Sequence, residues 1–147
     1  MMNSNLKIKK LDEKAVIPTY ESSYSAGADL YALLDDQIII NPGETELIRT
    51  GLAMEIPIGY AGFLYARSGL ASKKGLAPAN KVGVIDADYR GEIMVALHNH
   101  SNESQIVENG ERVAQIVFAP FYKADFKVVD ELEDTIRGDG GFGSTGK

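Results

Sequence analysis

An all-β fold is predicted for this chain: a jelly-roll-like β-barrel with one short helix and a flexible, glycine-rich C-terminal arm. Short runs of β-branched and aromatic residues recur along the sequence and are separated by turn residues. These runs do not alternate with long helical patterns, which argues against a parallel sheet. The last eleven residues contain five glycines, and glycine loses more backbone freedom on ordering than any other residue.

The expected elements follow one another closely. We expect strands at residues 38–40, 46–54, 62–66, 92–97 and 114–118. The clearest turns are NPG at residues 41–43 and IPIG at 56–59, and residues 68–74 are expected to form one or two helical turns. No linker, repeat or low-complexity segment interrupts the first part of the chain. We therefore expect one β domain over residues 1–130 and an arm over residues 131–147.

Composition limits the classes of partner. A chain of 147 residues suits one domain. It has no cysteine, no charged-then-apolar export segment and no apolar run near the length of a bilayer span, so we expect a cytoplasmic protein without a membrane partner. A net charge of −6 argues against general nucleic-acid binding. A phosphate ligand would need local cations, and candidates are Arg67, Lys73, Lys74, Arg90, Arg112 and Arg137.

The arm sequence RGDGGFGSTGK has the chemistry of a phosphate-binding segment. Glycine-rich turns present successive N–H groups to phosphate oxygens, Arg137 offers a planar fork of donors, and Ser144 and Thr145 add hydroxyls. Phe142 provides a flat face for stacking. The spacing is close to that of a P-loop, but Ser144 stands at the lysine position, which argues against a P-loop nucleotidase. From composition alone, a disordered glycine- and serine-rich end is the alternative.

The segment GVIDADYRG at residues 83–91 carries the sharpest candidate for catalysis. Asp86 follows an apolar, strand-like pair and precedes a turn that ends at Gly91. A carboxylate at such a rim can act as a general base toward water, with Asp88 as a possible partner. The alternative is an ordinary hairpin in which both aspartates cap backbone N–H groups. The segment alone leaves both interpretations open.

Five segments together resemble the homotrimeric all-β dUTPase family. They are AGADLYA (26–32), ARSGLASKKG (66–75), GVIDADYRG (83–91), GERVAQIVF (110–118) and the glycine-rich arm. A single motif of this kind is weak evidence, whereas five in the order of the family are specific. The resemblance implies a dUTPase-like barrel and hydrolysis of dUTP to dUMP and pyrophosphate, which lowers dUTP and supplies dUMP for dTMP synthesis.

The resemblance also implies roles for the residues near the phosphates. Asp86 matches the general base that activates water to attack the α-phosphorus. Mg²⁺ would bridge the three phosphates, and Asp29 would interact with the metal indirectly, without being one of its direct ligands. The residues that match phosphate contacts are Arg67, Ser68, Gly69 and Gln115 in the domain and Arg137, Gly143, Ser144 and Thr145 in the arm.

Selection of base and sugar is implied for a second group of residues. Asn80 matches an asparagine whose amide serves both a carbonyl and an N–H of uracil, and the backbone of Gly83 and Val84 would complete that edge. Tyr89 matches the tyrosine that packs beneath deoxyribose and leaves no room for a 2′-hydroxyl. Phe142 would stack on uracil.

In this family each site draws on three chains, so the arm would close the site of a neighbouring subunit in a homotrimer. Two rival functions differ in testable ways. A dCTP deaminase of the same superfamily would need a glutamate where Ala96 stands, so that activity lacks its base. A non-catalytic binding protein on the same fold is the second rival. His98 and His100 alone are too few ligands for a zinc site.

Overall fold

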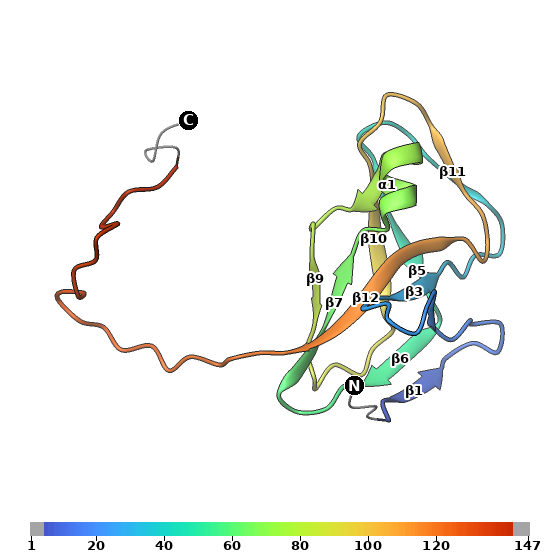
Figure 1. Cartoon of the computed structure of the whole chain (residues 1–147). Helices are drawn as coiled ribbons and strands as arrows, with labels where there is room; N and C mark the ends of the chain where they lie inside the picture. Colours follow the sequence, from blue (N-terminus) through green and yellow to red (C-terminus); the bar gives the residue numbers. More distant parts are fainter. Residues whose placement is uncertain (1–4, 143–147) are drawn as a thin grey trace.

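Four antiparallel sheets form the barrel in the computed structural model, which describes residues 5–142 (Figure 1). The largest sheet has the strand order β2-β3-β12-β7-β9, and the next has the order β5-β10-β8. Two two-stranded sheets, β1-β6 and β4-β11, complete the barrel. The strands are β1 (Lys7–Lys10), β2 (Thr19–Tyr20), β3 (Ala28–Tyr31), β4 (Ile38–Ile40), β5 (Thr45–Arg49), β6 (Leu52–Glu55), β7 (Tyr60–Tyr65), β8 (Leu76–Pro78), β9 (Gly83–Ile85), β10 (Met94–Asn99), β11 (Gln105–Val107) and β12 (Arg112–Pro120). The predicted all-β class is confirmed.

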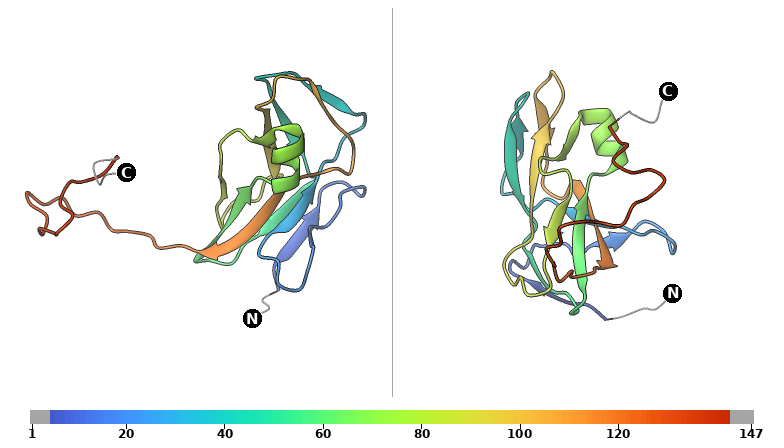
Figure 2. Two further views of the ribbon diagram at one scale, coloured as in Figure 1. Left: turned by 45° about the horizontal axis from the view of Figure 1, so that its top comes forward. Right: turned by 90° about the vertical axis from the view of Figure 1, so that its left-hand side faces the viewer.

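The core draws residues from all four sheets and from α1, and in the right view of Figure 2 strands β5 and β10 lie opposite β7 and β12. Strand β10 shows strict alternation, with Val95 and Leu97 buried and their neighbours half-buried. This is the period of two that a strand with one face on the core requires. Leu30 on β3 and Ile116 on β12 are also fully buried. The sheet that carries the candidate site is therefore fixed by apolar burial on its inner face.

The single strand predicted at residues 46–54 is wrong, because the chain turns there between two different sheets. β5 pairs with β10, whereas β6 pairs with β1. Gly51 between them has φ +69°, a left-handed conformation that glycine adopts without a Cβ penalty. The hydroxyl of the buried Thr50 donates to the carbonyl of Ile93 at 2.6 Å. This hydrogen bond anchors the turn to the segment that leads into β10.

The predicted short helix is confirmed as α1 (Ser68–Lys74). Leu70 is its buried residue, and Gly75 ends it in the left-handed conformation while donating to the carbonyl of Ala71 at 3.0 Å. Lys73 and Lys74 lie in the last turn, where cations interact favourably with the helix dipole. No helix within residues 5–142 has the length and hydropathy that crossing a membrane requires.

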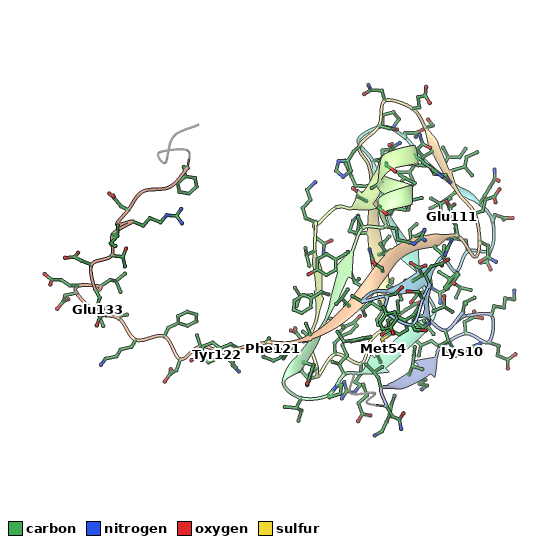
Figure 3. All side chains as sticks on the ribbon, viewed as in Figure 1. Lys10, Met54, Glu111, Phe121, Tyr122 and Glu133 are labelled. Atoms are coloured by element: carbon green, nitrogen blue, oxygen red, sulfur yellow. The ribbon has the colours of Figure 1, made fainter. Side chains whose placement is uncertain are left out.

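Beyond β12 the chain leaves the barrel as an extended segment (Figure 1, Figure 2). Phe121 still donates to the carbonyl of Gly59 at 3.1 Å. From residue 122 to 142 the described chain contains no helix or strand, and its hydrogen bonds stay within the segment. Tyr122 and Glu133 lie on this segment in Figure 3, away from the domain. The boundary expected at residue 130 therefore falls inside the extended segment, which begins about ten residues earlier.

Candidate active site

A cavity of about 340 Å³ opens where three of the predicted segments meet on the five-stranded sheet. Neighbouring strands bring them together, because Gln115 on β12 lies opposite Asp29 on β3 and opposite Tyr65 on β7. Arg67 and Ser68 follow β7 directly. The lining residues are Glu21, Ser25, Ala26, Gly27, Asp29, Tyr65, Arg67, Ser68, Gln115 and Val117. The structure thus gathers four of the predicted site residues, Asp29, Arg67, Ser68 and Gln115, at one cavity.

Asp29 holds two arginines at this cavity. Asp29 is buried, with only 10% of its side chain exposed, and its Oδ1 accepts from Nε of Arg67 at 2.6 Å. Its Oδ2 accepts from Nη1 of Arg112 at 3.2 Å, and the same Nη1 donates to Oε2 of Glu21 at 2.8 Å. The hydrogen bond to Glu21, followed by the charge of Asp29, raises the pKa of Arg112. Four charged groups therefore form one connected chain beside the cavity.

Gln115 braces the loop that carries Arg67. Its Nε2 donates to the carbonyl of Ala66 at 2.9 Å, directly before Arg67 in the sequence. A Cβ at Gly27 would collide with the Gln115 side chain, so glycine is required there for Gln115 to lie in this position. The glycine of the AGADLYA segment therefore has a packing role.

A second cavity, of about 540 Å³, also borders Arg67. Gly69, Lys73 and Arg112 line it, together with Tyr31, Leu70, Lys74, Gly110 and Glu111. Nζ of Lys74 is paired with Oε1 of Glu111 at 2.6 Å. Arg67 lines both cavities and is therefore the side chain common to them.

The Asp86 hairpin lies outside both cavities and exposes its polar side chains. Asp86 is exposed, and its backbone carbonyl, not its carboxylate, accepts from the N–H of Tyr89 at 3.1 Å. Within residues 5–142 neither Asp86 nor Asp88 accepts a backbone N–H through its carboxylate. The alternative of two capping aspartates is therefore wrong for this part of the chain.

The residues expected to select base and sugar lie around the same hairpin. Asn80 is exposed in the turn before β9, and Val84 on β9 is also exposed. Tyr89 is 42% exposed, and its hydroxyl donates to the carbonyl of Glu92 at 2.9 Å. A Cβ at Gly83 would lie 3.1 Å from Cβ of Leu64 and 3.3 Å from Nδ2 of Asn80, so this position is tight.

Strand register separates the hairpin from the cavity on one chain. β9 runs antiparallel to β7, with Gly83 opposite Leu64 and Ile85 opposite Gly62. Asp86 therefore lies at the Tyr60 end of β7, whereas Arg67 follows its Tyr65 end, next to α1 in Figure 1. At about 3.3 Å per strand residue, the two are separated by roughly 20 Å. A single chain therefore does not bring Asp86 to Arg67 and Ser68.

The described arm residues Arg137 and Phe142 line neither cavity. Nε of Arg137 donates to the carbonyl of Gly140 at 2.8 Å, and Phe142 is fully exposed. Gly143, Ser144 and Thr145 lie outside the described residues. Four cavity residues were not predicted as site residues: Glu21, Ser25, Tyr65 and Val117. Each reaches the cavity through strand pairing or its position in a loop, and its residue type alone does not indicate a site.

The barrel and its cavity define an all-β protein with a site suited to a phosphate-bearing ligand, since arginine and serine side chains converge there. A family model described as dUTPase matches residues 13–146. The deoxyuridine 5′-triphosphate nucleotidohydrolase of Nautilia profundicola is 54% identical over 142 residues, which cover 97% of this chain and 99% of that protein.

Two solved structures are similar as well. A mutant dUTPase of Staphylococcus bacteriophage 80alpha with dUpNHpp has a TM-score of 0.86 at 29% identity and covers 99% of this chain and 100% of its own. A mutant dUTPase of S. aureus phage phi11, described with a structural Mg(II) ion, has a TM-score of 0.80 at 26% identity and covers 89% and 100%. The chain belongs to the dUTPase family.

Proposed function

We propose that this chain is a dUTP diphosphatase that hydrolyses dUTP to dUMP and pyrophosphate. The observation that carries the proposal is the cavity itself. In a member of the dUTPase family, Arg67, Ser68 and Gln115 meet there, while a separate hairpin exposes Asp86. The product dUMP is a precursor for dTMP synthesis, and the reaction lowers dUTP. The cytoplasm is the compartment proposed, on the composition described above.

Asp86 would act as the general base. Its carboxylate takes a proton from water as the water oxygen attacks the α-phosphorus, and the bond from that phosphorus to the bridging oxygen of pyrophosphate breaks. Arg67 and Ser68 would donate to the phosphate oxygens, and Gly69 would offer its N–H from the start of α1. Exposure of Asp86 supports this role, since a base must reach a water molecule and its substrate.

Mg²⁺ is the proposed metal, and its main ligands would be the phosphates of dUTP. Within residues 5–142 no three histidine, cysteine, aspartate or glutamate side chains are grouped to hold a metal ion. Both carboxylate oxygens of Asp29 already accept from arginine, so Asp29 would reach the metal only through water. This donor set fits an ion that arrives with its substrate and keeps several waters. When bound, Mg²⁺ would neutralise negative charge on the phosphates.

Asn80 and the backbone of Gly83 and Val84 would form hydrogen bonds with uracil, and Tyr89 would exclude a ribose 2′-hydroxyl.

Gly91 offers a test of the Tyr89 role, because a Cβ at Gly91 would lie 2.6 Å from Cζ of Tyr89. We expect Gly91→Ala to displace the ring and to lower the ratio of kcat/KM for dUTP to that for UTP by about tenfold.

Tyr89→Phe is the matched control for Gly91→Ala. It removes the hydrogen bond to the carbonyl of Glu92 but keeps the ring, and should retain most of the preference for dUTP. Unchanged discrimination in Gly91→Ala, with correct folding, would argue against Tyr89 as the sugar-selecting residue.

A homotrimer with shared active sites is part of the proposal. The separation of roughly 20 Å between Asp86 and Arg67 on one chain supports it, since a base must lie within hydrogen-bond reach of its water. The arm over residues 131–147 would close the site of a neighbouring subunit. There Arg137, Gly143, Ser144 and Thr145 would contact phosphates and Phe142 would stack on uracil. The extended course of residues 122–142 supports this, because it carries exposed apolar side chains such as Phe126 and Ile136.

Release of pyrophosphate tests the function directly. We expect the chain to release pyrophosphate from dUTP with Mg²⁺, and at least about a hundredfold less efficiently from dCTP, dTTP or UTP, because a wrong base or sugar leaves polar groups unpaired or clashes. Chelation of the metal with EDTA should abolish the release. No release from dUTP under these conditions would refute the proposal and favour a non-catalytic binding protein.

A further inference from the structure

Four charged side chains, Glu21, Arg112, Asp29 and Arg67, are connected by hydrogen bonds. Of these, only Arg67 is needed to contact a nucleotide under the proposed function. Glu21 lies in the loop after β2, and its side chain is 77% exposed, whereas that of Asp29 is 10% exposed. These four linked charged groups therefore lead from solvent to a buried carboxylate and then to Arg67, which lines both cavities.

Arg112 is directed at Asp29 by an irregularity in the sheet. Between β12 and β3, Arg112 pairs with Tyr31 and Ala114 pairs with Leu30, so the register shifts by one residue at Val113. Such a bulge re-aims the side chains beside it. Asp29 is two residues from Tyr31 and shares its face of β3, which brings it diagonally opposite Arg112.

The geometry of Arg67 gives this arrangement a function. Arg67 contacts Asp29 through Nε alone, at 2.6 Å, and the other oxygen of Asp29 is occupied by Arg112. Within residues 5–142 the four terminal N–H donors of Arg67 make no hydrogen bond, so they are available for a ligand. If Arg112 were absent, the free Oδ2 could accept a second bond from Arg67, as carboxylates and guanidinium groups commonly pair in two parallel bonds.

We propose that Arg112, anchored by Glu21, is a positioning residue: by occupying Oδ2 of Asp29 it prevents a two-bond Arg67–Asp29 pair and keeps the terminal donors of Arg67 directed at the nucleotide phosphates. This inference rests on the proposed function of the site. Arg112 acts through Arg67 and does not need to contact the substrate. Glu21 contributes less, since an exposed ion pair is weak and screened by salt.

A double-mutant cycle on the full chain separates this role from a structural one. The affinity for dUpNHpp and kcat/KM for dUTP are measured for the wild type, Arg112→Gln, Arg67→Gln and the double variant. We expect Arg112→Gln to weaken both by about tenfold in the wild-type background, and by less than about twofold in the Arg67→Gln background. A cost that persists without Arg67 would indicate a structural role or direct contact of Arg112, and would overturn the inference.

Glu21→Gln provides a second variant that keeps the test decisive if Arg112→Gln fails to fold. We expect Glu21→Gln to lower the affinity for dUpNHpp and kcat/KM for dUTP by about two- to threefold. This loss should decrease at high salt and be absent in the Arg67→Gln background. Glu55→Gln is the matched control, because Glu55 forms an exposed pair with Lys7 at 3.0 Å on the β1-β6 sheet. A wild type that neither binds dUpNHpp nor hydrolyses dUTP would refute the proposed function itself. A wild type that does both, with additive costs, would refute only the positioning role.

Discussion

Replacing Asp86 by asparagine should lower kcat for dUTP by about 10²–10⁴-fold, the usual contribution of a general base. Asparagine has the size of aspartate but takes no proton from water. Asp86 is exposed and its carboxylate makes no hydrogen bond within the described residues, so the fold should be unaffected. Steady-state pyrophosphate release measures the loss, and an unchanged melting temperature excludes unfolding as its cause.

Asp88→Asn is the matched control for this prediction. Asp88 is an exposed carboxylate two residues away on the same hairpin, and its loss should cost far less. Full activity of Asp86→Asn would contradict the assignment of the base. An equal loss in both variants would contradict Asp86 as the single base and make the two carboxylates a functional pair.

Mixed trimers of two strongly impaired variants should recover activity, which is the second large effect expected. A site that takes Asp86 from one chain and Arg67 from another is intact only when the first chain carries Arg67→Gln and the second carries Asp86→Asn. In randomly mixed trimers at equal amounts, about a quarter of the sites should meet this condition. Sites built within one chain would give no recovery at any ratio.

The measurement requires exchange of subunits. The two variants are co-refolded from denaturant, and pyrophosphate release per chain is compared with that of each variant refolded alone. Variants folded separately and then mixed are the control, since they should show recovery only as fast as subunits exchange. No recovery after co-refolding, in a sample whose mass is that of a trimer, would contradict the shared site and require Asp86 to reach Arg67 within one chain.

The sequence predicted an element correctly where interactions between residues close in the chain determine that element. Gly75 ends α1 in a left-handed conformation after residues that favour a helix, so residues 68–74 were predicted correctly. The β-branched run at residues 38–40 became β4 as predicted. In contrast, Gly51 did not mark the turn between β5 and β6, because the apolar pattern runs through it and the two strands join different sheets. Other short strands, such as β2 and β8, were missed because pairing with neighbours, not propensity, creates them.

The sequence by itself determined the all-β class and the short helix, because these follow from residue types and their spacing within short segments. The candidate site residues came from the resemblance of five segments to the dUTPase family. The tertiary structure alone decided how they meet. Register across β3, β12 and β7 puts Asp29, Gln115 and Arg67 at one cavity, and the bulge at Val113 directs Arg112 to Asp29. The same register puts Asp86 at the opposite end of β7. Such contacts join residues far apart in the chain, and their geometry depends on strand pairing and core packing that no local segment encodes.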